Sequence, residues 1–588
     1  MRAYRLSRYN SRLLSPLPSP WPTRLWVCPA RSLFVSCSRA VATASPTADK
    51  PYYVTTPIFY VNADPHVGHM YSMVLADVLR RWKDLNGIPT VLSTGVDEHG
   101  MKVQQAAAKA RLDPKPFCDR GAETFKDLAL KANVLNDHFV RTSDKSHQDA
   151  VQYAWQLLSD RGYIYKSKHE GWYCVSDETF YPQSGVQLIV EPRSGRKIMA
   201  SMETGKEVEW TSEKNYHFRL SAFRDDLLSF CNECPDWIKP SFRHREIKKA
   251  VREGLQDLSI SRPSERLSWG IPVPGDPSQT IYVWLDALFN YASIVGYPWA
   301  PGHESAGGWP ADVHVIGKDI SRFHCIYWPA FLMALSLPLP KHILTHSHWT
   351  LGRLKMSKST GNVVNPFFAL DRFGVDTMRF YMVHDGSIEN DADYSNYWII
   401  ERYKKVLKGT LGNLVSRVTR PKIWSIRYAV MQYARVAELN PSDTMERQIT
   451  QALRDLPALV TTRMDALDVS GAVRAIVDVL FLGNKYIDHV APWSRVGRGT
   501  QFDWERPPPE EVNKCVYLIT EALRLSGILL QPVMPNKMTL LLDMLGVDGN
   551  CRAFQHAKFM LDNSYGESSV ELSKGQDKVL FPPLTAER

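Results

Sequence analysis

The stretch that decides the fold is PYYVTTPIFYVNADPHVGHMYSMVLADVLRRWKDLNGIPTVLSTGVDEHG, residues 51–100. Its first part, 51–61, is rich in β-branched and aromatic residues and predicts a buried strand. Apolar residues then recur at helical spacing over 66–82, and the Asn-Gly pair at 86–87 ends that run. Residues 88–96 predict a second strand. A strand, a helix and a strand in this order form a βαβ unit, the beginning of a doubly wound parallel sheet.

The predicted helix has an unusual first turn. Pro65 suits that turn, and Gly68 stands between His66 and His69. Glycine costs about 1 kcal/mol against alanine in a helix interior, so its presence needs a reason. A helix amino terminus binds phosphate through its free N–H groups, and a glycine one turn in lets a flat base lie on the backbone. The segment therefore predicts a site for ATP; the alternatives are that the two histidines cap the helix or bind zinc.

Composition narrows the class of protein. The chain has 588 residues, of which 44 % are hydrophobic and 23 % are charged, as is typical of globular proteins. It is too long for a single core, so several domains are expected. It contains no apolar stretch long enough to span a membrane, so we expect no membrane partner. Nine cysteines at irregular spacing are typical of free thiols in a reducing compartment.

Residues 1–48 differ from the rest of the chain. They contain seven arginines and many serines but no Asp, Glu or Lys, which is typical of a mitochondrial transit peptide. The alternative is a basic arm that stays on the protein and binds RNA. The leader supplies seven of the nine net positive charges, which leaves about +2 for the remainder. Net charge therefore does not indicate a nucleic-acid-binding protein, and any polyanion must be bound by local patches.

We expect a sheet built in two halves, 50–165 and 276–345, around an insertion at 166–275 that is rich in turns and short extended segments. Residues 346–410 follow with a lysine motif, and 411–588 predict an all-α bundle. The fold class is thus α/β, a Rossmann-like doubly wound sheet interrupted by an insertion and followed by helices. Breaks between the helices are expected at 440–443, 491–493 and 506–511.

The lysine motif is KMSKST, residues 355–360. Lys355 and Lys358 suit a loop that closes on pyrophosphate, where they would offset the negative charge that builds on the leaving group. Ser357 and Ser359 would donate hydrogen bonds. Charges that act only in the transition state raise the rate rather than the affinity alone. Taken by itself, the motif could also be an exposed surface loop.

His-x-Gly-His after the first strand and Lys-Met-Ser-Lys-Ser after the last, about 290 residues apart, resemble the paired signatures of class I aminoacyl-tRNA synthetases. The resemblance implies an enzyme that joins an amino acid to ATP and passes it to the terminal adenosine of a tRNA. The segments TTPIFYVNADPHVGH, GVDEHG, YVWLDALFNY and IGKDISRFHCIYWPA further resemble the methionine-specific branch of that family, with L-methionine, ATP and tRNA(Met) as partners. The alternatives are a class I enzyme for cysteine or isoleucine and an inactive tRNA-binding relative.

The resemblance implies how methionine is held. The Asp97 carboxylate and the Ile58 backbone carbonyl would bind its ammonium group. A thioether gains roughly 0.3–1.5 kcal/mol from contact with aromatic rings. Tyr291 and His324 are also expected to offer the sulfur a weak hydrogen bond, which an aliphatic competitor cannot accept. The residues expected around the methionine side chain are Tyr60, Trp284, Ala287, Tyr291 and His324.

The resemblance also implies an ATP site with Mg²⁺ arriving on the nucleotide. Asp319 would lie near the ribose, although an aspartate in this position could instead cap a helix. The expected ATP-binding residues are His66, Gly68, His69, Asp319, Lys355, Ser357 and Lys358. The expected catalytic residues are His66, His69, Lys355 and Lys358.

Three residues of the helical region are implied as readers of the anticodon. Asn413 and Arg417, four apart on one helix face, would bind base edges, and Trp493 would stack on an unpaired base. The alternative is a surface pair at 413 and 417 and a tryptophan that fills the bundle. In the insertion Cys174 stands alone, and Cys231 and Cys234 form a single pair with no second pair near it. Structural zinc normally takes four ligands, so no structural zinc is expected. No further module is expected after the bundle, which favours a monomer.

Overall fold

The computed structural model describes residues 50–175, 178–181, 183–190, 195–300, 302–356, 362–436, 439, 441, 443–497, 501–570 and 579–584. All of these residues belong to one compact unit, Lys50–Arg588. The predicted leader, residues 1–48, lies outside the described residues. In the part of the chain that is described, every helix is too short or too polar to cross a bilayer.

The amino-terminal half is built on a six-stranded sheet in which each described pair of neighbours is parallel. Its strands, in spatial order, are β3 (His138–Arg141), β2 (Thr90–Asp97), β1 (Tyr52–Tyr60), β14 (Val313–Gly317), β15 (His342–His346) and β9 (Ile238–Lys239). From β1 the chain proceeds one way through β2 and β3, and later the other way through β14 and β15. The topology therefore switches between β1 and β14, where ligands bind beyond the carboxyl ends of the strands. The predicted doubly wound sheet is confirmed.

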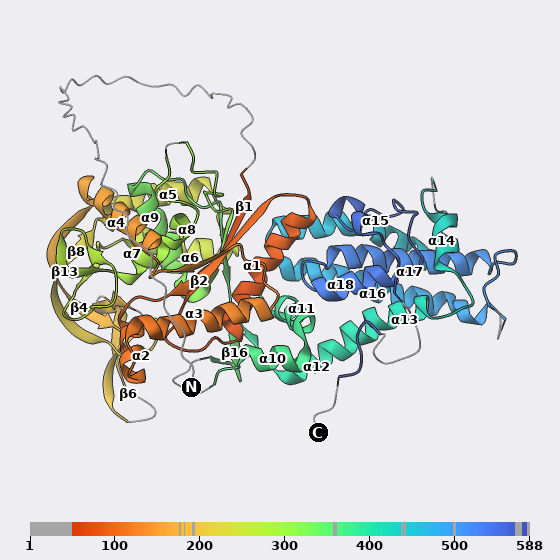
Figure 1. Cartoon of the computed structure of the whole chain (residues 1–588), viewed down its shortest axis with the longest axis horizontal. Helices are drawn as coiled ribbons and strands as arrows, with labels where there is room; N and C mark the ends of the chain where they lie inside the picture. Colours follow the sequence, from red (N-terminus) through yellow and green to blue (C-terminus); the bar gives the residue numbers. More distant parts are fainter. Residues whose placement is uncertain are drawn as a thin grey trace, which may run out of the picture. The chain divides into compact units, whose positions relative to one another are not determined.

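Helices cover both faces of this sheet (Figure 1). On one face, Val54 of β1 joins a core with α1 (Val67–Leu85) and α3 (Pro114–Lys131). On the other face, Tyr53 joins a core with α4 (Lys145–Asp160) and α9 (Trp328–Ala334). Adjacent strand residues point to opposite faces, so one apolar strand supplies both cores. A shorter helix, α2 (Met101–Ala110), follows β2.

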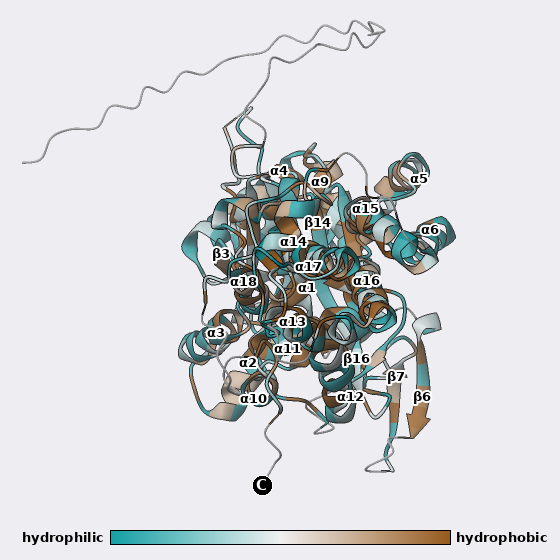
Figure 2. Cartoon of the chain, turned by 90° about the vertical axis from the view of Figure 1, so that its right-hand side faces the viewer, coloured by the Kyte–Doolittle hydropathy of each residue, from teal (hydrophilic) through white to brown (hydrophobic). Residues whose placement is uncertain are grey.

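The body of the insertion is an antiparallel ladder between β4 (Ile164–Cys174) and β8 (Glu209–Phe218). The remaining strands are β5 (Thr179–Tyr181), β6 (Val186–Val190), β7 (Lys197–Ser201) and β10 (Leu258–Ser259). Cys174 packs with Val186 and Val208 in a small separate core, which holds this region by apolar contact. Strand β6 is coloured hydrophobic in Figure 2, and its Leu188 is 63 % exposed.

The insertion differs from the single block expected at 166–275. Helix α5 (Arg224–Glu233), β9 and α6 (Ser241–Glu253) interrupt it, and β9 pairs with β15 in the main sheet. A strand of two residues is too short to leave a periodic pattern in the sequence, so its return to the sheet could not be predicted. A small antiparallel sheet follows, formed by β11 (Ser261–Pro263), β12 (Pro272–Val273) and β13 (Asp276–Ile281).

The second half of the fold continues through α7 (Val283–Leu288) and α8 (Asn290–Ser293) to β14. After β15, the lysine motif begins in a small sheet of β16 (Trp349–Leu351), β17 (Leu354–Lys355) and β18 (Ala392–Asp393). Helices α10 (Pro366–Phe373), α11 (Val375–Asp385) and α12 (Asn396–Arg402) and a π-helical segment, Tyr403–Gly412, lead to the carboxyl-terminal helices.

The carboxyl-terminal helices are α13 (Asn413–Thr419), α14 (Ile426–Tyr433), α15 (Thr444–Asp465), α16 (Val469–Val490), α17 (Glu510–Leu529) and α18 (Pro535–Met544). Every residue of α17 from Val512 to Leu529 is buried, as expected of a central helix surrounded by others. The predicted breaks lie directly before α15 and directly after α16, and the third, 506–511, overlaps the first two residues of α17. The helical prediction is therefore confirmed.

Candidate functional site

The amino terminus of α1 is closed by the two histidines of the first motif. His66 is the N-cap residue, and its Nδ1 accepts the Gly68 N–H at 3.0 Å. In return, the His66 N–H donates to Nδ1 of His69 at 3.1 Å, and the two rings stack with centroids 3.8 Å apart. A Cβ at position 68 would lie only 2.8 Å from Cε1 of His66. A side chain at position 68 would therefore displace the His66 ring from the cap, and glycine leaves it in place.

These contacts correct two details of the sequence prediction. The helix begins at Val67, so Pro65 and His66 precede its first turn. The amides of the first turn are not free either: the Val67 N–H donates to the Val364 carbonyl at 3.1 Å, and the Gly68 N–H donates to His66. The capping role, considered as an alternative, is the one that the geometry displays.

One of these contacts joins the histidine motif to the segment that follows the lysine motif. The carbonyl of Val364 in that segment accepts a hydrogen bond from Val67, which lies within the histidine motif. Lys355 ends β17, which pairs with β16, but its side chain lies outside what is described. Ser357, Lys358 and Ser359 also lie outside the described residues. The segment that follows the motif therefore reaches the start of α1 at the carboxyl side of β1.

Asp319 lies in a single 3₁₀ turn, Lys318–Ile320, directly after β14. Gly317 occupies the N-cap position, so the capping alternative for Asp319 is wrong. Its carboxylate instead lies 3.0 Å from Nε2 of His348 and is about half exposed. The sequence prediction missed His348; its only signal was a second histidine shortly before the lysine motif.

Asp97 is the last residue of β2 and lies next to the end of β1. It is only 3 % exposed, and burial together with the negative charge of Asp286 raises the pKa of its carboxyl well above the ordinary value. Tyr60 is its register partner in β1, and Ile58 pairs with Gly95. The carbonyl of Ile58 and the carboxylate of Asp97 thus belong to the carboxyl ends of adjacent strands.

The predicted side-chain wall comes from α7, α8 and a π-helical segment, Phe323–Tyr327, after β14. Trp284 stacks on Phe323 with centroids 3.7 Å apart. The Tyr291 hydroxyl lies 2.7 Å from Nε2 of His324, whose Nδ1 lies 3.0 Å from the Ile320 carbonyl. Burial lowers the pKa of His324 to about 4, so its ring is neutral.

This geometry corrects the expected hydrogen bond to sulfur. Nδ1 of His324 must carry the proton, because it can only donate to the Ile320 carbonyl. Nε2 then accepts the hydroxyl proton of Tyr291, so neither group has a spare donor. The pair offers a thioether a polarisable surface instead.

The sequence prediction also missed a buried cluster behind this wall. The two carboxylate oxygens of Asp286 lie 2.6 Å from Nδ1 of His99 and 2.7 Å from Nε2 of His147. His99 was visible after the second strand, but nothing in the sequence pairs it with residues far along the chain. In the described residues, no group of three or more His, Cys, Asp or Glu side chains could hold a metal ion.

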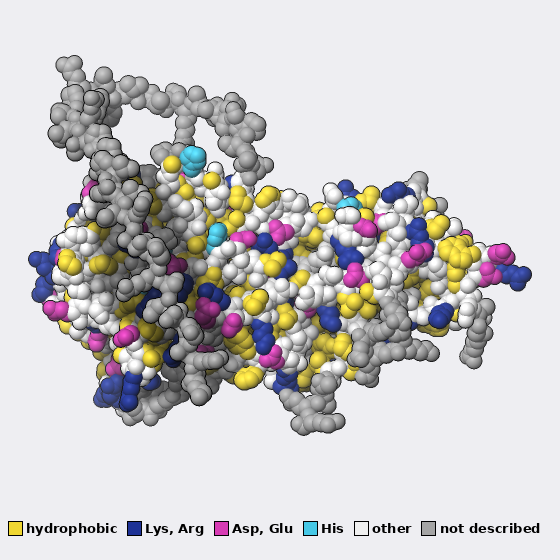
Figure 3. Space-filling view, in the orientation of Figure 1, with side chains coloured by type: hydrophobic (Ala, Val, Ile, Leu, Met, Phe, Trp, Pro, Cys, Tyr) yellow, Lys and Arg dark blue, Asp and Glu magenta, His cyan; other side chains and the backbone are white. Residues whose placement is uncertain are grey.

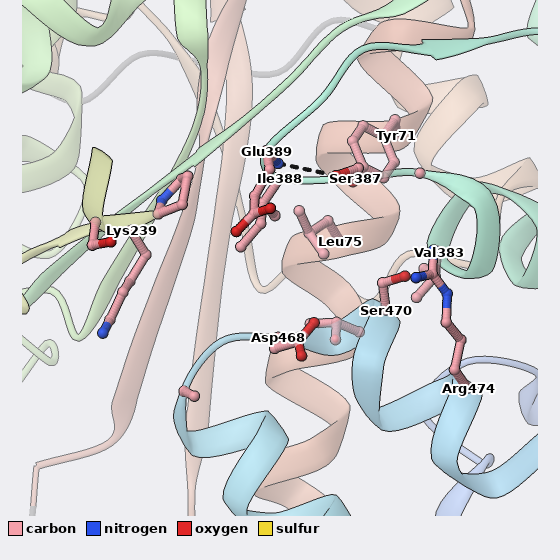
Figure 4. Close-up of a pocket in the computed structure, with 15 residues that line it drawn as sticks. Tyr71, Leu75, Lys239, Val383, Ser387, Ile388, Glu389, Asp468, Ser470 and Arg474 are labelled. Atoms are coloured by element: carbon pink, nitrogen blue, oxygen red, sulfur yellow. Dashed lines mark hydrogen bonds between the residues drawn. The ribbon is translucent and has the colours of Figure 1, made fainter. Parts of the chain in front are cut away.

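A cavity of about 360 Å³ is lined by residues other than those of this site. Figure 4 shows Tyr71 and Leu75 of α1 on one side, segment 387–389 on another, and Asp468 and Ser470 at the start of α16. None of the described predicted site residues lines it.

The three predicted anticodon readers lie together on the helical region. The guanidinium of Arg417 lies over the Trp493 ring, 4.6 Å from its centroid, and pairs with Asp488. Nδ2 of Asn413 is 3.5 Å from Oδ1 of Asn484. Trp493 is 44 % exposed, so it does not fill the bundle. On the face shown in Figure 3, basic and acidic side chains are interspersed, in agreement with the small net charge.

Comparisons with known proteins give a consistent result. A family model described as tRNA synthetases class I (M) matches residues 52–419. A Neurospora crassa protein named as a probable mitochondrial methionine–tRNA ligase is 51 % identical over 95 % of this chain and 91 % of its own. The Bos taurus mitochondrial methionine–tRNA ligase is 40 % identical, with 92 % of each chain covered. The crystal structure of Mycobacterium tuberculosis methionyl-tRNA synthetase bound by methionyl-adenylate is 36 % identical, with a TM-score of 0.80 over 91 % of this chain and 100 % of that one.

Proposed function

This chain belongs to the class I tRNA synthetases (M), and we infer from that premise that it activates L-methionine with ATP and transfers it to tRNA(Met) in mitochondria. The observation that carries the inference is a contact at the switch point of the sheet between the histidine motif and the segment that follows the lysine motif. There the Val364 carbonyl accepts the N–H of Val67, the first helical residue and part of the histidine motif.

We propose that methionine lies across the carboxyl ends of β1 and β2. Its ammonium group would bind the Asp97 carboxylate and the Ile58 carbonyl, and binding of this cation would favour the charged form of Asp97 against its raised pKa. Its side chain would contact five residues of β1, α7, α8 and the π-helical segment. These are Tyr60, Trp284, Ala287, Tyr291 and His324.

Activation then needs no nucleophilic side chain. The methionine carboxylate attacks the α-phosphorus of ATP in line, the bond to the bridging oxygen breaks, and methionyl-adenylate and pyrophosphate form. His66 and His69 would contact the phosphates, Gly68 the base and Asp319 the ribose. Positioning and charge stabilisation supply the catalysis.

The lysine motif is assigned to the departing pyrophosphate. Lys355 and Lys358 would balance its growing negative charge, and Ser357 would donate to it. Mg²⁺ would enter on the phosphates of ATP, because it usually binds through substrate phosphates and water with only one or two carboxylates.

In the second step a ribose hydroxyl of the terminal adenosine attacks the acyl carbon of the adenylate, and AMP leaves. We assign recognition of the tRNA to Arg417, Trp493 and Asn413. The Trp493 ring and Asn413 are exposed, and Arg417 is half-buried. Because the substrate site and the RNA-reading surface lie on one chain, we propose a monomer, which light scattering of the purified protein would check.

Pyrophosphate exchange into ATP, measured with each of the twenty amino acids, tests the proposal. We expect exchange with methionine and charging of tRNA(Met). Exchange with cysteine or isoleucine alone would reassign the substrate, and no exchange with any amino acid would identify a non-catalytic tRNA-binding protein.

A further inference from the structure

Asp286 is the centre of a buried hydrogen-bonded cluster that the proposed catalytic roles leave unexplained. Its side chain is fully buried, and His99 and His147 are each 3 % exposed. One carboxylate oxygen faces each histidine, at 2.6 and 2.7 Å. Burying a carboxylate is costly unless both oxygens have partners, so a cluster of this kind needs a structural or functional reason.

The cluster is joined to the proposed anchor for the ammonium group. His99 lies two residues after Asp97, and its backbone N–H points to Oδ1 of Asp97 at 3.3 Å. The side chain of the same histidine is held by Asp286. The orientation of the Asp97 carboxylate therefore depends on a residue of α7.

The cluster also contacts the helices that form the proposed wall around the methionine side chain. Asp286 directly precedes Ala287 in α7, and His147 reaches it from α4. Nδ1 of His147 lies 2.8 Å from Oγ of Ser293 in α8, two residues after Tyr291. Both ends of the proposed methionine site are thus tied to one carboxylate.

We propose that Asp286 is a positioning residue: together with His99 and His147 it sets the distance between the ammonium anchor and the side-chain wall, and thereby the affinity for methionine. The proposal rests on the proposed function of this pocket. Asp286 does not itself touch the substrate.

The charge of Asp286 gives the proposal a second consequence. Burial alone would raise the pKa of Asp286, but the charges and hydrogen bonds of His99 and His147 overcome burial and lower it. Burial and the charge of Asp286 raise the pKa of Asp97. Removal of that charge therefore lowers the pKa of Asp97. The other charged or titratable groups that face Asp97 are Tyr60 of β1, Lys102 of α2, Cys118 of α3 and Glu178.

The test is Asp286→Asn in the full chain, assayed by ATP–pyrophosphate exchange over a range of pH. We expect the KM for methionine to rise about tenfold, because a hydrogen bond to a charged group is lost, with the KM for ATP within about twofold of the wild type. The pH profile of kcat/KM for methionine reports ionisations of the free enzyme. Its fall on the acid side, the acid limb, should move to lower pH. Equal rises in both KM values, an unchanged KM for methionine, or an acid limb that stays in place would overturn the proposal.

Two further variants keep the test decisive if Asp286→Asn folds poorly. Ser293→Ala removes the outer hydrogen bond to His147 together with a local bond from the same hydroxyl to the Asn290 carbonyl within α8. We expect the KM for methionine to rise roughly threefold with that for ATP unchanged; no rise would contradict the proposal. Glu98→Gln is the matched control, because Glu98 is equally buried but faces Arg141 and Ser143 instead of α7. It should leave the acid limb in place. Wild-type exchange with another amino acid but not with methionine would refute the proposed function separately.

Discussion

At the scale of one residue, the buried carboxylate of Asp97 lowers the stability of the fold when it is charged. The native state holds the Asp97 proton more tightly than the unfolded chain does, because its pKa is raised. This contribution to stability is fully present below the ordinary pKa of Asp and is lost as pH rises through the native pKa. Above that pH, the buried charge without a bound ammonium group opposes folding.

We therefore expect Asp97→Asn to raise the melting temperature at pH 8 while it removes the ammonium anchor. Truncating one partner of a buried charge pair costs about 2–5 kcal/mol, so the KM for methionine should rise roughly a hundredfold. Calorimetry at pH 8 and pH 4, with pyrophosphate exchange, checks both effects, and the stabilisation should shrink at pH 4. A lower melting temperature at pH 8 would contradict this account of Asp97.

Trp493 offers a second test at this scale. Trp493→Ala removes the ring beneath Arg417, and loss of a stacked base is worth about 1–3 kcal/mol. We expect the KM for tRNA(Met) in charging to rise roughly tenfold, with pyrophosphate exchange unchanged. Trp504→Ala is the matched control, since Trp504 is 57 % exposed but contacts Tyr428 and Phe502 instead of the predicted readers. A loss of exchange in Trp493→Ala would indicate damage to the fold instead.

At the scale of elements, His66 at the start of α1 has two roles: it caps the helix, and it is proposed to take part in catalysis. Replacement of an N-cap by alanine costs about 0.5–2 kcal/mol, whereas asparagine is among the best N-caps. We expect His66→Ala to lose both stability and adenylate formation. His66→Asn should recover the stability but not the activity. Thermal melts and exchange rates of the two variants distinguish the roles; full activity in His66→Asn would restrict His66 to capping.

The elements that could be predicted from sequence are those with strong local patterns. β1, α1 and β2 fall within two residues of their expected bounds at nearly every end, because apolar periodicity and the Asn86–Gly87 stop signal are local. The two-residue β9 has no such pattern. The partners of Asp286 and Asp319 were also beyond prediction, because each is brought near by the fold from a distant segment. The resemblance to known motifs identified the expected site residues. The structure shows which neighbouring residues hold them in place.

At the scale of the whole molecule, Arg379 joins the sheet-containing half to the helical region. It and Asp77 of α1 are fully buried, and their ion pair is 2.6 Å long. Its other donors bind the Ala132 carbonyl after α3 and the carbonyls of Pro532 and Val533 between α17 and α18. One side chain thus connects segments from both halves.

Arg379→Met should therefore destabilise the whole unit, because the buried carbonyls that Arg379 binds lose their donor, at about 1–3 kcal/mol for an unsatisfied buried group, while Asp77 keeps Arg81 as a partner. Exchange and tRNA charging should fall together with the folded fraction, and the urea midpoint should drop. Lys83→Met is the control: Lys83 pairs with the half-exposed Asp465 of α15, and a surface pair contributes about 0–1 kcal/mol. An unchanged midpoint in Arg379→Met would refute the connecting role.

The position of β1 inside the sheet has a consequence for biosynthesis. Val54 of β1 pairs with Val313, so the central strand cannot complete its hydrogen bonds until the ribosome has added 259 more residues. Until then the growing chain exposes an unpaired, apolar strand edge, which favours aggregation. The first helix likewise lacks the carbonyl of Val364 that its Val67 amide binds. We therefore expect a chain that stops short of Val364 to form no adenylate, although it retains the first motif.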